Sequence, residues 1–341
     1  MHALPMSDQR IPSSHLDGLP DPARRLRFME VTRRRMQEAR FSPRTQRAYA
    51  YWIRRFIHFH DRRHPKEMGD EHVRAFLSML AVEAKVSAST QNQALAALRF
   101  LYDRVLARPL SRLDGVVPAR GSRREPVVLS DSEVRSMLRA LADPARLCTE
   151  LMYGSGLRVG ECMALRIKDI DLSRREITVR GGKGDKDRRT PLAERSCDRL
   201  GRQMKRAYER FRLDERRGIR TSGLGAALMR KLPNADREFI WHYVFGATRT
   251  YVDPAGVRRR HHLDVSVVQR AVRAAARTAG MTKRVTCHSF RHSFATHLLE
   301  SGSDIRTVQE LLGHEDVETT MIYTHVWKGG RPGVRSPADD L

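Results

Sequence analysis

Residues 288–325 read HSFRHSFATHLLESGSDIRTVQELLGHEDVETTMIYTH, and their apolar spacing predicts three consecutive helices. The first helix is expected to end at Gly302, and its apolar stripe consists of Phe290, Phe294 and Leu298. The second is expected to end at Gly313, and its stripe consists of Ile305, Val308, Leu311 and Leu312. A third begins near Glu315. This part of the chain is therefore predicted to be helical, with basic and hydroxyl-bearing side chains along it.

Helical spacing also marks the amino-terminal third of the chain. Ser42 suits a helix cap and Pro43 the first helical turn. Residues 21–40 have a helical and strongly basic pattern, which fits either a solvated face or contact with phosphates. Apolar stripes at helical spacing follow over residues 49–57, 73–80 and 95–105. A small bundle of about four helices is therefore predicted here.

A β-component is expected in the second half. In residues 176–193, Ile177 and Val179 alternate with polar residues, and a glycine-rich turn leads to a return strand, which predicts a hairpin. Residues 238–246 are predicted to form another strand and residues 266–279 another helix. The predicted fold class is mainly α with a small antiparallel β-sheet.

Composition shifts predict the domain boundaries. Residues 111–126 are rich in proline, glycine and arginine and are interpreted as a linker. Ser130 and Glu133 form a capping box that starts the first helix after it. The expected order is a flexible extension, a helical domain, the linker, a mixed domain and a tail, at residues 1–24, 25–110, 111–126, 127–330 and 331–341.

The charge balance points to a polyanionic partner. Lys plus Arg number 64 against 40 Asp plus Glu, so the formal net charge is +24, which favours nucleic acid. The chain lacks an apolar run of about 18 residues and a secretory leader, so a cytoplasmic protein with no membrane partner is expected. Four widely spaced cysteines and no paired His or Cys spacing predict no metal site.

Phosphodiester chemistry without a metal ion needs cations that meet the charge developing on the phosphate oxygens. Guanidiniums suit this task because their donors are forked and permanently charged, and Arg158 and Arg291 are the candidates. Imidazoles donate or relay protons near neutral pH, and His288 and His314 are the candidates. His288 and Arg291 lie three residues apart and therefore share a helix face.

The same chemistry needs a nucleophile and a proton for the leaving 5′ oxygen. Lys183, in the glycine-rich turn, is the candidate proton donor. Tyr323 would attack phosphorus and conserve the bond energy as a phosphotyrosine. Its phenol has an ordinary pKa of about 10 and needs cationic neighbours to ionise. Each residue alone fits a structural role equally well; the set in this order is far more specific.

The chain resembles the tyrosine recombinases, also called phage-type integrases, from about residue 25 to residue 330. The matching stretches are Gly156-Leu157-Arg158-Val159-Gly160-Glu161, Gly182-Lys183-Gly184, the ten residues from His288 to His297, Leu312-Gly313-His314 and Tyr323-Thr324-His325. The resemblance implies that Tyr323 is the nucleophile and that Glu161 is a supporting acidic residue. It also implies a catalytic set of Arg158, Lys183, His288, Arg291 and His314.

The resemblance also implies an architecture and an assembly. A helical, SAM-like core-binding domain and a mixed α+β catalytic domain would form a C-shaped clamp on DNA. Four protomers would assemble on two DNA sites and exchange strands in pairs through a Holliday junction. Neither a metal nor a nucleotide cofactor is expected, and the expected location is the bacterial cytoplasm, with the nucleoid.

A long stretch near residues 213–262 resembles the added segment of integron integrases, which Xer-type recombinases lack. Integron integrases capture gene cassettes, and the resemblance implies DNA sites folded as single-stranded hairpins with extrahelical bases. Trp241 offers such a base a stacking face, although a strand-core role fits it equally well. The resemblance assigns further base contacts to Pro254, His261 and His262, although a solvated loop also explains the two histidines.

Three other functions stay open from the sequence. The first is a Xer- or phage-type recombinase that acts only on double-stranded sites, which would tolerate deletion of residues near 220–237. The second is a non-catalytic DNA-binding protein that keeps the fold, which the complete catalytic set argues against. The third is a relaxase similar to type IB topoisomerases that works as a monomer. The tail after Tyr323 favours the assembling recombinases instead.

Overall fold

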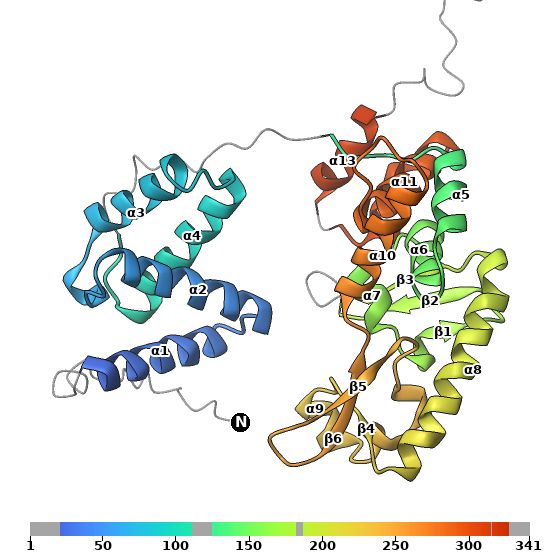
Figure 1. Cartoon of the computed structure of the whole chain (residues 1–341), viewed down its shortest axis with the longest axis horizontal. Coiled ribbons are helices and arrows are strands. Elements are labelled where there is room, and N and C mark those ends of the chain that lie inside the picture. Colours follow the sequence, from blue (N-terminus) through green and yellow to red (C-terminus); the bar gives the residue numbers. More distant parts are fainter. Residues whose placement is uncertain (1–20, 111–124, 182–186, 315, 327–341) are drawn as a thin grey trace, which may run out of the picture. The chain divides into compact units, whose positions relative to one another are not determined.

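The chain divides into two compact units, Met1–Arg123 and Arg124–Leu341, each with its own hydrophobic core (Figure 1). The computed structural model describes residues 21–110, 125–181, 187–314 and 316–326. The predicted extension before residue 21, most of the predicted linker and the predicted tail lie outside these described residues.

The first unit is a helical bundle, as its apolar spacing predicts. The Ser42 hydroxyl accepts a hydrogen bond from the backbone N–H of Thr45 at 3.1 Å, and Pro43 begins the following helix. The apolar stripes of the helices bury Phe56, Phe76 and Leu98 completely. The α-helices are α1 (Asp21–Glu38), α2 (Pro43–Phe59), α3 (Asp70–Val82) and α4 (Ala88–Phe100). Two short turns accompany them, a 3₁₀ turn at Pro65–Glu67 and a π turn at Leu101–Val105.

The second unit is also mainly helical. The predicted capping box is present, because the Ser130 N–H donates to Glu133 Oε2 at 2.7 Å and the Glu133 N–H donates to Ser130 Oγ at 3.3 Å. Helix α11 packs against α6, α12 and α13. The helices are α5 (Asp131–Ala140), α6 (Ala145–Gly154), α7 (Val159–Ala164), α8 (Glu194–Arg216), α9 (Ala226–Lys231), α10 (Val265–Thr278), α11 (Cys287–Glu300), α12 (Ile305–Leu312) and α13 (Val317–Val326).

Two small sheets complete this unit. The predicted hairpin is present as β2 (Glu176–Val179) and β3 (Arg188–Pro191), with β1 (Ile170–Asp171) added antiparallel to β2. A second sheet has the order β4 (Arg220–Thr221), β6 (Arg258–His262) and β5 (Gly246–Val252). It lies with α9 at the end of the unit away from α11 and α13 (Figure 1). The predicted fold class is confirmed, except that β4 pairs with β6 in parallel.

The predicted strand at residues 238–246 is wrong. Residues Phe239–Trp241 form a 3₁₀ turn, and the four residues from His242 to Phe245 are all buried, which breaks the alternation of a half-exposed strand. Strand β5 begins only at Gly246 and forms a hairpin with β6 that the sequence analysis did not predict. The strongly basic residues 194–216 form the 23-residue helix α8.

Candidate active site

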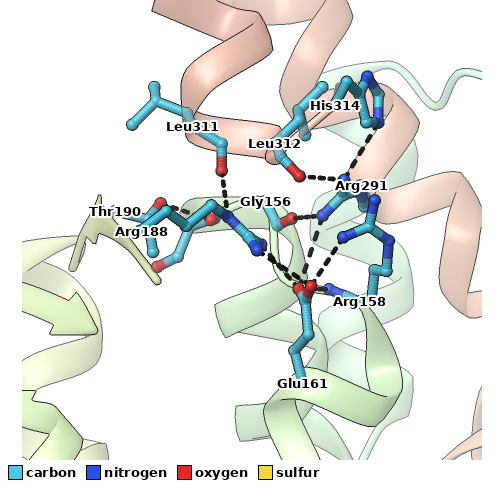
Figure 2. A network of polar contacts seen from close by, with 10 residues as sticks. Gly156, Arg158, Glu161, Arg188, Thr190, Arg291, Leu311, Leu312 and His314 are labelled. Carbon is cyan, nitrogen blue, oxygen red and sulfur yellow. Dashed lines mark hydrogen bonds and ion pairs between the residues drawn. The ribbon is translucent and has the colours of Figure 1, made fainter. Parts of the chain in front are cut away.

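Three arginines from different elements converge on the carboxylate of Glu161 (Figure 2). Arg158 caps α7 and Glu161 lies three residues on, so the Arg158 N–H donates to Oε2 at 2.8 Å and its Nη1 donates to Oε1 at 2.7 Å. Burial raises the pKa of the Glu161 carboxyl, but hydrogen bonds from Arg188 and Arg158 outweigh it and bring the pKa to about 2. Glu161 is therefore ionised and fixes the arginines around it.

Arg188, the first residue of β3, was not anticipated from the sequence. Its Nη1 and Nη2 donate to the two oxygens of Glu161 at 3.0 and 2.7 Å, and its Nε donates to the carbonyl of Leu311 at 2.8 Å. Its side chain is 9% exposed. The sequence signal that could have identified Arg188 is the period of two along a strand. Arg188 lies two residues before the buried Thr190 and therefore points to the same side of the sheet.

Arg291 lies at the centre of the cluster and is buried on α11. It donates to the carbonyl oxygens of Gly156 at 2.5 Å and Leu312 at 2.6 Å, and it lies 3.7 Å from Glu161. Burial and the neighbouring Arg158 lower its pKa to about 9, so it remains a cation at neutral pH. One carboxylate thus faces three guanidiniums, and this excess of positive charge suits an anion such as a phosphate.

Two predicted histidines lie beside these arginines. His314 Nε2 is 3.2 Å from Arg291 Nη2, and its Nδ1 is 3.0 Å from Thr320 Oγ1. Burial, Arg291 and Arg158 lower its pKa to about 4, so the neutral ring accepts from Arg291 and donates to Thr320. Burial and Arg291 also lower the pKa of His288. Both imidazoles are therefore neutral near pH 7.

Tyr323 on α13 is brought to the same cluster. Its ring lies nearly parallel to that of His314, at 12° with centroids 6.4 Å apart, and its hydroxyl is 2.9 Å from His292 Nδ1. Burial raises the pKa of Tyr323, while Arg291 and Arg158 oppose that shift. His292 was not assigned a role from the sequence, although it follows Arg291 directly. Lys183 lies outside the described residues.

A cavity of about 420 Å³ adjoins the cluster, because Glu161 is one of its lining residues. Trp241, His261 and His262 all line it, so the structure brings three of the four predicted base-contacting residues together. Lys168 Nζ lies 3.6 Å from the centroid of the Trp241 ring, and the two histidine rings are 4.0 Å apart. Pro254 lies in the turn between β5 and β6 and does not line this cavity.

Within the described ranges, no group of three His, Cys, Asp or Glu side chains is arranged to hold a metal ion. The helices in those ranges include none long and apolar enough to cross a membrane.

Comparisons with known proteins identify the family. Residues 128–329 match the phage integrase family, and residues 28–112 match the N-terminal SAM-like domain of phage integrases. An integrase/recombinase of Escherichia coli is 48% identical over 94% of this chain and 95% of its own length. Tyrosine recombinase XerA of Thermococcus kodakarensis is 34% identical over 84% of this chain and 86% of its own.

A solved structure shows the same fold. It is the XerH site-specific recombinase bound to palindromic difH substrate in a post-cleavage complex, with a TM-score of 0.55 and 22% identity over 83% of this chain and 76% of that one. The family match covers more than half of the chain, and the relatives match nearly all of it. The chain therefore belongs to the phage integrase family and is a tyrosine site-specific recombinase, an enzyme that cleaves and rejoins DNA strands.

Proposed function

We propose that Tyr323 is the nucleophile of this recombinase and that the arginines around Glu161 bind the scissile phosphate. The Tyr323 oxygen attacks phosphorus, the bond from phosphorus to the 5′ oxygen breaks, and a 3′-phosphotyrosyl intermediate forms. Arg158 and Arg291 stabilise the charge on the nonbridging oxygens, assisted by His288 and His314. The convergence of these side chains with Tyr323 around one buried arginine supports this proposal.

In this first step the leaving 5′ oxygen takes a proton, which we assign to Lys183, between β2 and β3 in the sequence. The second step reverses the first. A 5′ hydroxyl of the partner strand then attacks phosphorus and releases Tyr323. Four protomers on two DNA sites would perform these exchanges in pairs. The net charge of +24 favours binding to DNA in the nucleoid of the bacterial cytoplasm.

We further propose that the DNA sites are folded single strands of the integron type. The cavity beside Glu161 supports this proposal, because it has the size and lining of a site for an extrahelical base. Trp241 presents an aromatic face, and the ring nitrogens of His261 and His262 can hydrogen-bond a base edge. Burial and His262 lower the pKa of His261, which keeps this ring neutral near pH 7. Pro254 would contact a base only outside this cavity.

The test is formation of an SDS-resistant, protease-sensitive adduct on a labelled cassette-type hairpin with unpaired bases and on its fully paired duplex. We expect an adduct on the hairpin, a weak one on the duplex, and none for Tyr323→Phe, which keeps DNA binding. Cleavage by Tyr323→Phe would exclude this nucleophile. Equal amounts of adduct on the hairpin and the duplex would still support the recombinase chemistry but would contradict the integron assignment.

The cavity has its own test. Trp241→Ala should lower adduct formation on the hairpin by about 5- to 150-fold, because base–aromatic stacking contributes about 1–3 kcal/mol, and should spare the duplex. Trp241→Phe is the matched control, since it keeps an aromatic face and should retain most of the rate. Equal losses on the hairpin and the duplex would contradict a role in base binding.

A Xer-type recombinase that acts only on double-stranded sites is the second candidate. The 34% identity to XerA over most of both chains favours it. It predicts full activity of Trp241→Ala on duplex sites and no preference for the hairpin. The same two substrates therefore separate the candidates.

A further inference from the structure

The hydroxyl of Tyr323 is hydrogen-bonded to a side chain outside the catalytic set proposed above. His292 Nδ1 lies 2.9 Å from the phenolic oxygen, while Tyr323 is only 1% exposed. A nucleophile and a base within hydrogen-bonding distance are the geometric signature of activated nucleophiles. We propose that His292 is the base that takes the proton of Tyr323 during attack, a proposal that rests on Tyr323 being the nucleophile.

The electrostatic surroundings fix the direction of this hydrogen bond. Burial, His288 and Arg291 lower the pKa of His292 to about 4, so its ring is neutral near pH 7. The phenol, whose pKa is raised by burial, keeps its proton. The O–H of Tyr323 therefore donates to the lone pair of Nδ1, and the proton of the imidazole is on Nε2. This is the arrangement that a general base needs before the reaction.

Phosphate binding would strengthen this base. The charged and titratable groups around His292 and Tyr323 are His288 and Arg291 on α11, His314 after α12, and Arg158 beside α7. A phosphate held by Arg158 and Arg291 offsets their positive charge, which raises the pKa of His292 toward its ordinary value. Since the base form is lost as pH falls through that pKa, cleavage should decline on the acid side.

The proton balance closes over both steps. In cleavage, the bond from the phenolic oxygen to phosphorus forms, the phenolic proton moves to His292 Nδ1, and the 5′ oxygen leaves with a proton from Lys183. In rejoining, the incoming 5′ hydroxyl gives its proton to Lys183 and attacks phosphorus. The phosphotyrosyl bond breaks, and His292 returns the proton to the phenolic oxygen.

The same helix contains a matched control. His297 lies five residues after His292 on α11, and its Nδ1 is 2.9 Å from the hydroxyl of Tyr153. This second tyrosine–histidine pair belongs to a contact with Asp131 at the start of α5, away from the arginines around Glu161. His297→Asn therefore makes the same replacement in a tyrosine–histidine pair of α11 without touching the proposed nucleophile.

The experiment is single-turnover adduct formation from pH 5 to pH 9 on the hairpin and duplex described above. His292→Asn keeps a group that can accept a hydrogen bond but cannot take a proton. We expect its rate near pH 7 to fall by about 10²–10⁴-fold with DNA binding retained. We also expect that rate to rise about tenfold per pH unit from pH 7 to pH 9, because hydroxide must then ionise the phenol, while the rates of wild type and His297→Asn stay level over this range.

A second variant gives a positive readout. Free imidazole should restore part of the rate of His292→Ala and leave that of Tyr323→Phe at zero. The proposal would be overturned if His292→Asn formed the adduct at least as fast as wild type, or if its rate fell but kept the pH dependence of wild type. It would also be overturned if imidazole did not restore the rate of His292→Ala. If wild type still forms the adduct in those cases, the proposed function stands and only the role of His292 is lost. If wild type forms no adduct on either DNA, the proposed function and the role of His292 are both overturned.

Discussion

At the scale of single residues, the Glu161 carboxylate is the centre of the site, and the Arg188 guanidinium binds both of its oxygens. Arg188→Met removes two charge-assisted hydrogen bonds to Glu161 and one to Leu311. We expect the free energy of unfolding to fall by about 1–3 kcal/mol, and cleavage to fall because Glu161 no longer fixes Arg158 and Arg291. Chemical denaturation and single-turnover cleavage measure the two effects.

The adjacent Arg189 supplies the control for this prediction. Its side chain is 67% exposed and pairs with Glu176 at 3.5 Å, so Arg189→Met should change the free energy of unfolding by about 0–1 kcal/mol. Arg188→Lys should behave like Arg188→Met in cleavage, because an ammonium group cannot bind both carboxylate oxygens as a planar fork does. Similar losses for Arg188→Met and Arg189→Met would refute the role of Arg188.

At the scale of elements, the loop between α6 and α7 carries the carbonyl that holds Arg291. Gly156 has a φ of +63°, and a Cβ there would lie 2.5 Å from Phe294 Cε1. Gly156→Ala should therefore lower the free energy of unfolding by more than about 1–2 kcal/mol and displace Arg291, whose Nη1 donates to the Gly156 carbonyl. Thermal denaturation and cleavage assays would detect both losses.

Gly160, four residues further and within α7, is the contrasting glycine. A Cβ at this position meets nothing within 4 Å. Gly160→Ala should therefore leave stability unchanged or raise it by up to about 1 kcal/mol, since alanine favours a helix over glycine. A larger loss from Gly160→Ala than from Gly156→Ala would show that the proposed packing around Gly156 is incorrect.

At the scale of the whole molecule, buried neutral imidazoles make the stability of the second unit pH-dependent. Burial is the main cause that lowers the pKa values of His242, His292 and His314 to about 4. A histidine in the unfolded chain has a pKa of about 6.5, so the unfolded state binds protons first as pH falls. The stability contributed by burying these rings neutral is therefore full above about pH 6.5 and is lost toward pH 4.

Calorimetry of the full chain at pH values from 7.5 to 4 would check this. Each ring contributes about 1.4 kcal/mol for every pKa unit between the folded and unfolded states, so the transition of the second unit should move to lower temperature. The Glu161 carboxyl, with a pKa of about 2, adds a further loss only as pH falls below about 4. A transition that does not move between pH 6.5 and 4.5 would contradict the burial of these rings.

Local rules allowed much of this protein to be predicted from its sequence. The cap at Ser42, the capping box of Ser130 and Glu133, and the hairpin around residues 176–193 depend on residues a few positions apart. The order of Arg158, His288, Arg291, His314 and Tyr323 pointed to one family, and the structure gathers these residues around Glu161 and Arg291. Short-range patterns of spacing and residue type therefore determined the fold class and the family.

Contacts between distant residues decided the rest. Residues 242–245 form hydrogen bonds with Leu165, Ile167 and Leu263 in place of a regular strand ladder. These partners are distant in the sequence, so the local pattern of residues 238–246 still looked like that of a strand. Arg188 and Glu161 are 27 positions apart, and His292 and Tyr323 are 31. Their hydrogen bonds, and the cavity of Trp241, His261 and His262, form only when separate elements pack together. The sequence by itself determined most helices, the hairpin and the family, because these follow from local spacing and from the order of a few residue types; the tertiary structure alone decided which side chains lie around Glu161 and Tyr323.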